Sequence, residues 1–319
     1  MSDWKRLLCG LLAALLLAAC AAPASSAAAQ DSAVEFVDAQ GAQVALQSWD
    51  RVVSLYGSFA ELWLLSGGTL VGATTDAVEE RGLDLGADVA LVGNVKTPSL
   101  EEVLALEPDF VILSADIEGH VALDESLTAA GVPHAYFRVD NFEDYYTVLR
   151  QFCRMTGRDD LFEEYGAAQQ QRVERIKAAA AHMQDAAPTV LLIRAYSTGA
   201  KAKGTDIFAG AMLAELGADN IVTRYDSLLE DLSMETIIAA DPDMILMVPM
   251  GANEDAAAAY MAEHFEANPA WAGLTAVQNG CYAMLPKELF HYKPNARWAD
   301  SYAYLAKILY PQLTDEQLA

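Results

Sequence analysis

Residues 99–113 read SLEEVLALEPDFVIL, and residues 233–247 read SMETIIAADPDMILM. Five of the fifteen aligned positions are identical: the serine, the glutamate two residues later, one alanine and the Pro-Asp pair. In both stretches the serine can cap a helix, apolar residues recur at helical spacing, and Pro-Asp ends the helix before a short apolar strand. Such a unit can recur by chance in α/β proteins, but we interpret the pair as a duplication, which predicts two related halves.

Short apolar runs alternate with helical stretches on both sides of these units. The runs that we predict to be strands are 51–56, 70–75, 90–93, 110–114, 134–139, 190–194, 221–222, 244–248 and 281–285. The polar stretch 160–183 has a helical composition and predicts one long helix between the halves. Strands that alternate with helices form parallel sheets, and their ligands bind beyond the carboxyl ends of the strands. We therefore predict an α/β protein with two three-layer lobes, mainly parallel sheets, one long joining helix and a ligand cleft between the lobes.

The N-terminus has the pattern of an export signal. Lys5 and Arg6 precede the apolar run 7–17, which is too short to cross the roughly 30 Å of a membrane's hydrocarbon core. Residues 21–32 are small or polar, so they cannot bury a core and suit a flexible tether. We predict a signal peptide at 1–19, a tether at 20–33, an N-terminal lobe at 34–157, a connecting helix at 158–186 and a C-terminal lobe at 187–319.

The residue after the predicted cleavage site is Cys20, and it directly follows Leu-Ala-Ala. This order resembles the lipobox of bacterial lipoproteins, in which the cysteine becomes the mature N-terminus and carries lipid. The resemblance implies that Cys20 is lipidated and that the mature chain is anchored to the outer face of the bacterial cell membrane. An ordinary cleaved signal peptide with an incidental cysteine is the alternative.

The composition is that of a well-packed and strongly acidic protein. Of the 319 residues, 53% are hydrophobic and 20% are charged, and the net charge is -25. Such a charge disfavours nucleic acid and anionic membrane surfaces as direct partners. Cys153 and Cys281 follow the predicted tether, and two buried thiols are a simpler interpretation than a bridge between them.

Basic residues are scarce in the second half of the chain, and they gather in two segments. Residues 194–204 combine cations with small residues after a predicted strand, which suits an anion that approaches the backbone closely. Residues 290–298 interleave aromatic rings with cations, which suits a flat or catecholate-bearing anionic chelate. We predict ligand-binding roles for Tyr56, Lys96, Arg194, Tyr196, Lys201, Lys203, His291, Tyr292, Lys293, Arg297 and Trp298. Solvated surface charge for the lysines and core packing for Tyr56 are the alternatives.

Direct metal binding and catalysis find little support in the residues. The five histidines show no metal-ligand spacing, although His291 or Tyr292 could be an axial ligand to haem iron. Residues 198–201 read TGAK, which has the spacing of an acyl-transfer motif but lacks its serine and its accompanying elements. The sequence contains neither a phosphate-binding loop nor a nucleophile elbow. We predict no enzyme, with an exported lipid-anchored hydrolase and a surface adhesin or scaffold as alternatives.

Four stretches together resemble a known family, the substrate-binding lipoproteins of ABC importers for iron-siderophores, haem and cobalamin, in which a rigid helix joins two lobes. They are RVVSLYGS (51–58) with Glu61, Val92-Gly93 with PSLEEVLALEPD (98–109), GAMLAELGADN (210–220), and LSME (232–235) with DPD (241–243). The resemblance implies no catalysis and no resident cofactor. It implies capture of an iron chelate, a siderophore or haem, and delivery to an ABC permease and its ATPase. Cobalamin or another metal chelate is the alternative cargo.

The family also implies an acidic residue on the outer face of each lobe, where it docks on the permease. Glu79 and Glu80 stand near that place in the first lobe. In the second lobe the matching position is Ala211, and Glu215 would face a different side of the helix. This departure argues against a symmetric pair of docking glutamates, and we predict docking through Glu79, Glu80 and Glu215.

Overall fold

The computed structural model describes residues 33–183, 187–251 and 253–319. The predicted signal peptide, Cys20 and the predicted tether up to residue 32 lie outside the described residues, as does the end of the predicted connecting helix at 184–186. The predicted domain boundaries therefore stay predictions. Among the described residues, no helix is both long and apolar enough to cross a membrane.

A parallel sheet forms the core of the first half of the chain. Its strands run in the order β5-β4-β3-β8-β9, and each neighbouring pair is parallel. The strands are β3 (Val52–Ser54), β4 (Gly72–Ala73), β5 (Ala90–Leu91), β8 (Phe110–Ser114) and β9 (His134–Phe137). All residues of β3, β4 and β8 are buried, as is typical of a parallel sheet that is covered on both faces.

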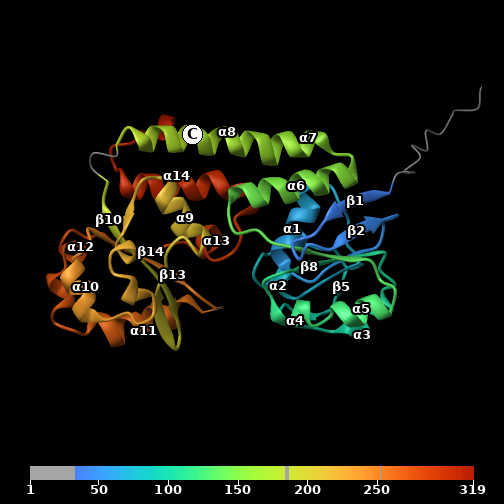
Figure 1. Cartoon of the computed structure of the whole chain (residues 1–319), viewed down its shortest axis with the longest axis horizontal. Coiled ribbons are helices and arrows are strands. Elements are labelled where there is room, and N and C mark those ends of the chain that lie inside the picture. Colours follow the sequence, from blue (N-terminus) through green and yellow to red (C-terminus); the bar gives the residue numbers. More distant parts are fainter. Residues whose placement is uncertain (1–32, 184–186, 252) are drawn as a thin grey trace, which may run out of the picture. The chain divides into compact units, whose positions relative to one another are not determined.

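Helices and two short hairpins surround this sheet (Figure 1). The helices are α1 (Gly57–Leu65), α2 (Asp76–Glu79), α3 (Leu100–Ala105), α4 (Glu118–Val121), α5 (Asp124–Ala129) and α6 (Phe142–Thr156). The hairpins pair β1 (Val34–Val37) with β2 (Gln43–Leu46), and β6 (Gly93–Asn94) with β7 (Thr97–Pro98). Sequence patterning missed both hairpins, because strands this short carry too few residues to show a period.

A second sheet forms in the second half of the chain. Its strands run in the order β11-β10-β13-β14, and β12 also pairs with β10. The strands are β10 (Thr189–Tyr196), β11 (Gly199–Ala202), β12 (Asp219–Asn220), β13 (Met244–Pro249) and β14 (Tyr282–Met284). All pairs are parallel except that β11 returns antiparallel to β10. The strand predicted at 221–222 is wrong, since Ile221–Thr223 forms a 3-10 turn directly after the short β12.

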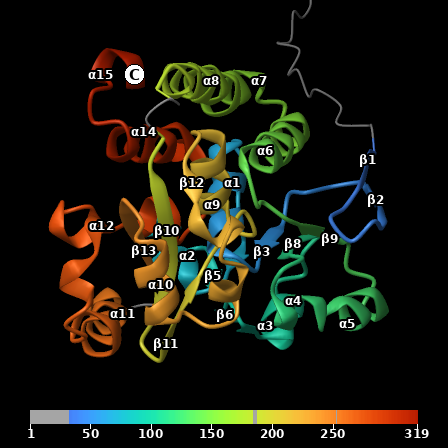
Figure 2. The same ribbon diagram turned by 60° about the vertical axis from the view of Figure 1, so that its left-hand side comes forward.

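A long helical run connects the two sheets, as the polar stretch predicts. It consists of α7 (Asp159–Phe162), a π-helical turn (Glu163–Ala167) and α8 (Ala168–Ala181). The later helices are α9 (Phe208–Glu215), α10 (Met234–Ala240), α11 (Glu254–Met261), α12 (Thr275–Gln278), α13 (Lys287–Phe290), α14 (Trp298–Leu309) and α15 (Asp315–Leu318). α14 packs along α8, and Figures 1 and 2 show the two helices side by side from two directions.

The two matching stretches of sequence fold in the same way. α3 leads into β8, and α10 leads into β13. Each helix is followed by a non-glycine residue in the left-handed backbone region, Glu107 with φ 46° and Asp241 with φ 39°. These two residues occupy equivalent positions in the aligned stretches, and non-glycine residues seldom adopt such values. The shared strained turn supports the duplication that the sequence suggests.

The aspartates of the two Pro-Asp pairs also play the same role. Asp109 Oδ1 accepts a hydrogen bond from the backbone N–H of Arg51 at 2.9 Å, just before β3. Asp243 Oδ2 accepts one from the backbone N–H of Thr189 at 2.8 Å, at the start of β10. Each carboxylate therefore ties the beginning of one strand to the beginning of its parallel neighbour.

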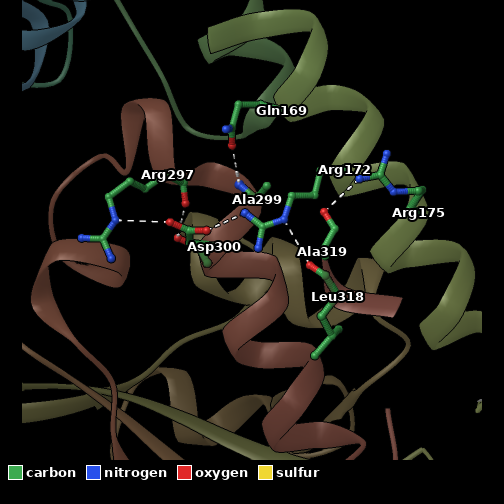
Figure 3. Close-up of polar contacts among 9 residues, drawn as sticks. Gln169, Arg172, Arg175, Arg297, Ala299, Asp300, Leu318 and Ala319 are labelled. Atoms are coloured by element: carbon green, nitrogen blue, oxygen red, sulfur yellow. Dashed lines mark hydrogen bonds and ion pairs between the residues drawn. The ribbon is translucent and has the colours of Figure 1, made fainter. Parts of the chain in front are cut away.

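Arginines of α8 tie the helical run to α14 and to the last residues of the chain (Figure 3). Arg172 Nη1 pairs with Asp300 Oδ1 at 2.6 Å, and Arg172 Nε donates to the carbonyl oxygen of Leu318 at 3.1 Å. Arg175 donates to the oxygen of Ala319 at 2.9 Å. These contacts hold α15 against α8.

We expect Arg172→Ala to lower the free energy of unfolding by about 1–2 kcal/mol, because it removes an ion pair and a hydrogen bond that are partly shielded from water. Urea unfolding followed by circular dichroism measures the change. Arg175→Ala is the matched control on the same helix, and losing its single exposed bond should cost no more than about 0.5 kcal/mol. Equal losses in the two variants would contradict this account of the clamp.

Candidate functional site

A cleft of about 950 Å³ opens where strands of both sheets end. Tyr56 follows β3 and Tyr196 ends β10, so the cleft lies beyond the carboxyl ends of parallel strands in both halves. The structure brings these predicted ligand-binding residues to it: Tyr56, Lys96, Tyr196, His291 and Tyr292. Their contact with a ligand stays a prediction.

A buried histidine braces the wall that the first half of the chain supplies. His120 Nδ1 accepts a hydrogen bond from the N–H of Ser114 at 3.0 Å, so its Nε2 carries the proton that it shares with the carbonyl oxygen of Val95 at 2.8 Å. Burial lowers the pKa of His120 to about 4. A Cβ added at Gly119 would lie 1.9 Å from the carbonyl oxygen of Lys96. The hairpin that carries Lys96 is therefore held closely against α4.

His291 and Tyr292 follow α13 and form part of the wall that the second half supplies. Burial, together with the charges of Lys287 and Arg194, lowers the pKa of His291 to about 4, so its ring is neutral at neutral pH. His291 Nδ1 is buried and has no hydrogen-bond partner among the described residues. The Tyr292 ring lies 5.6 Å from the guanidinium carbon of Arg81 and 5.3 Å from Lys287 Nζ. This wall offers a neutral imidazole and a phenol next to cations.

Two more predicted residues stand behind this wall. Arg194 is half-buried in β10, and its Nε has no hydrogen-bond partner among the described residues. Burial is the main reason that the pKa values of His291 and Lys293 are lowered. The positive charge of Arg194 lowers both pKa values further, so Arg194 lies near both side chains. Lys293 Nζ pairs with Asp140 Oδ1 at 3.5 Å. Positive charge is thus concentrated behind the wall of the second half.

Sequence reasoning missed three carboxylates that line the cleft: Glu80, Asp116 and Glu118. The chain that follows α2 brings Glu80 to the lining of the cleft, and its predicted docking role stays a prediction. Burial and the nearby Asp76 raise the pKa of Glu80. The strand-end rule points to Asp116, which follows β8, but Glu80 and Glu118 give no signal in a chain with 45 acidic residues.

The structure does not bring Lys201 and Lys203 to the cleft. The stretch 194–204 is not the anion-binding loop that its small residues predict, because β10 continues and β11 runs back beside it with Lys201 opposite Arg194. Lys203 Nζ pairs with Asp206 Oδ2 at 2.7 Å and lines a separate pocket of about 610 Å³ beside α9. The hairpin thus carries both lysines away from the carboxyl end of β10.

Arg297 and Trp298 are likewise outside the lining of the cleft. Trp298 is 0% exposed, and its ring centroid lies 6.0 Å from those of Phe142 and Tyr145. It begins α14 on the face that packs into the core, so a stacking role on a ligand is wrong. Arg297 Nε faces Asp300 Oδ2 at 3.4 Å, as Figure 3 shows, and its side chain is half exposed.

The predicted docking residues Glu79 and Glu215 have different surroundings. Glu79 ends α2 and is exposed. Glu215 accepts a hydrogen bond from Tyr302 Oη at 2.9 Å and pairs with Lys177 Nζ at 3.2 Å. Glu215 therefore joins α9 to α14 and α8. A docking role stays a prediction for both.

Cys153 and Cys281, the cysteines within the described residues, are free and do not pair with each other. Cys153 is buried, and burial raises its pKa to about 11, whereas Cys281 is half-buried. Within residues 33–183, 187–251 and 253–319, no three His, Cys, Asp or Glu side chains gather in a way that could hold a metal ion.

Comparison with known proteins gives matches over most of the chain. The model of the periplasmic binding protein family matches residues 52–289. The Fe(3+)-citrate-binding protein YfmC of Bacillus subtilis is 24% identical over 279 residues, which cover 85% of each chain. A periplasmic heme binding protein from Pseudomonas aeruginosa has a TM-score of 0.66 and 27% identity, with coverage of 84% of this chain and 95% of that one. S. aureus IsdE, complexed with heme, has a TM-score of 0.67 and 18% identity, with coverage of 82% and 99%.

We expect the free energy of unfolding to decrease as the pH falls from about 6.5 to about 4. The folded protein holds His120 neutral down to a pKa of about 4, whereas the unfolded chain protonates near the ordinary value of 6.5. The unfolded state therefore binds more protons in this window, which costs stability on the order of 3 kcal/mol for His120. His291 acts in the same direction.

Urea unfolding at several pH values between 7 and 4 measures this effect. His120→Gln is the matched variant, because a glutamine can still donate and accept a hydrogen bond but does not titrate. Its stability should depend less on pH than that of the unchanged protein. The same pH dependence in both proteins would contradict the role given to His120.

Proposed function

Because the chain belongs to the periplasmic binding protein family, we propose that it captures an iron chelate, a ferric siderophore or haem, in the cleft and delivers it to an ABC permease. The observation that carries the proposal is the cleft itself. It lies beyond the strand ends of both sheets, and Tyr56, Tyr196, Tyr292 and the neutral ring of His291 line it.

The wall of the second half, with Arg194 and Lys293 behind it, suits a small, negatively charged and partly flat ligand, although the three carboxylates Glu80, Asp116 and Glu118 also line the cleft. Tyrosine rings can stack on such a ligand and also form hydrogen bonds with it. The buried Nε of Arg194 has no partner among the described residues, and a buried donor gains free energy when an anion's oxygen approaches it. The volume of about 950 Å³ is in the range of small-molecule sites.

The relatives support iron as part of the cargo. YfmC is named an Fe(3+)-citrate-binding protein, and the Pseudomonas neighbour is named a heme binding protein. Both names describe iron held in a complex. The aromatic side chains that line this chain's cleft agree with such a complex.

We propose that the mature chain works outside the cytoplasm, anchored to the bacterial cell membrane through lipid on Cys20. The apolar run and the Leu-Ala-Ala before Cys20 support this location. Its partners are then a permease and the ATPase that drives the permease, with the exposed Glu79 as one docking residue. Such a protein binds its ligand in a one-to-one ratio and does not convert it.

We expect one chelate to quench the protein's tryptophan fluorescence in a saturable one-to-one titration. The ligands to compare are ferric citrate, a ferric catecholate siderophore, haemin and cobalamin. Arg194→Ala should weaken binding of the accepted chelate about 10- to 100-fold, because it removes a charge-assisted hydrogen bond worth about 1–3 kcal/mol. Arg297→Ala is the control and should leave the affinity unchanged, since Arg297 faces Asp300.

Failure of all four ligands to saturate the protein would contradict the proposal. Equal losses of affinity in Arg194→Ala and Arg297→Ala would contradict the assignment of the site. Analysis of the recovered chelate by mass spectrometry distinguishes capture from turnover, and an altered chelate would favour a hydrolase.

A further inference from the structure

The short segment Tyr292–Asn295 lies between α13 and the 3-10 turn Asn295–Arg297 that leads into α14, and we call it the seam segment. Its first residue lines the cleft, so whatever holds the seam segment in place also holds a wall of the cleft. The segment contacts the first half of the chain at two places, one through Asn295 and one through Lys293.

Asn295 makes the first contact and is 1% exposed. Its Nδ2 donates hydrogen bonds to the carbonyl oxygen of Ser58 at 2.9 Å and to Glu61 Oε2 at 2.8 Å, both in α1. Its backbone has φ 50°, a left-handed value that non-glycine residues seldom adopt and that asparagine tolerates best. Glycine would adopt this backbone conformation at least as easily. The reason for an asparagine at this position is therefore its side-chain amide, which reaches α1.

The Asn295 contact continues to the cleft through two more side chains. Glu61 Oε2 also pairs with Arg81, whose side chain is 8% exposed. The guanidinium carbon of Arg81 lies 5.6 Å from the centre of the Tyr292 ring. Asn295, Glu61 and Arg81 therefore form a largely buried polar cluster, and one side of it packs against a residue that lines the cleft.

Lys293 makes the second contact on the other side of Pro294. Lys293 Nζ pairs with Asp140 Oδ1 at 3.5 Å, and Arg138 Nε lies 3.8 Å from Asp140 Oδ2. Arg138 Nε also pairs at 2.7 Å with Asp116, which lines the opposite wall of the cleft. The side chains of Arg138 and Asp140 are 46% and 55% exposed, so water and salt weaken this chain of ion pairs. The buried Asn295 contact is the stronger of the two.

We propose that Asn295 is a positioning residue that sets the spacing of the two cleft walls before a ligand arrives. Its amide fixes the seam segment to α1, and the Glu61–Arg81 pair transmits that position to Tyr292. A cleft whose walls are already in place spares the ligand the free energy of ordering them. The ligand part of this inference rests on the proposed function, whereas the spacing of the walls can be measured without a ligand.

The test uses Asn295→Gly in the full mature protein. Glycine accepts the left-handed backbone, so the variant removes the amide without adding strain. Arg172→Ala is the matched control, because it removes a polar contact between α8 and α14 in which no residue of the seam segment takes part. Glu61→Gln is a second variant that keeps the side chain's shape and loses its charge towards Arg81.

Distances between spin labels report the spacing of the walls directly. The labels are placed on cysteines at the exposed positions Glu125, in α5, and Ile238, in α10, with Cys281→Ser to remove the half-buried thiol. Without ligand, Asn295→Gly should broaden the distance distribution and Glu61→Gln should broaden it less. Arg172→Ala should leave it unchanged. An unchanged distribution in Asn295→Gly, or equal broadening in Arg172→Ala, would overturn the proposal.

Binding of haemin and ferric citrate completes the test. If Asn295→Gly leaves the correct spacing populated about one-tenth of the time, its affinity falls about tenfold, while Arg172→Ala keeps the full affinity. A broadened distribution with undiminished affinity would also overturn the positioning role. If the unchanged protein binds neither probe, the proposed cargo is wrong, and the spin-label distances still decide whether Asn295 sets the spacing.

Discussion

Two carboxylates determine how the strands of this protein start, and the cleft depends on both. Asp109 binds the backbone just before β3, and Asp243 binds the backbone at the start of β10. Because neighbouring strands run parallel from these fixed starts, the loops that follow them meet at one edge of each sheet. Tyr56 and Tyr196 stand at those edges and line the cleft.

The fold could be predicted largely from the sequence, because its signals are local and repeated. The Pro-Asp stretches mark the two halves, and the apolar run 110–114 has the same bounds as β8. Prediction failed where a local pattern fits two structures equally well. The small residues of 199–202 suit a loop as well as the antiparallel β11, and the two apolar residues at 221–222 suit a strand as well as a 3-10 turn.

The site was predictable only in part, since it depends on whether each side chain points into the cleft, into the core or to the outer surface. Strand-end reasoning located Tyr56 and Tyr196, and the aromatic-cation segment located His291 beside the cleft. The same segment led to a wrong prediction for Trp298. A tryptophan next to a cation in the sequence fits a ring that stacks on a ligand as well as a ring that packs into the core. Asn295 bonds to a residue 237 positions away, and no local pattern reports such a contact.

The central claim is that a ferric chelate is held between the walls that Tyr56 and Tyr292 supply. Anomalous X-ray diffraction at the iron absorption edge, from crystals of the loaded protein, tests it most directly because iron scatters anomalously there far more strongly than the protein's own atoms. The account predicts one iron peak inside the cleft, next to residues of both halves. A peak in the pocket beside α9 that Lys203 lines, or on the outer surface, would contradict it.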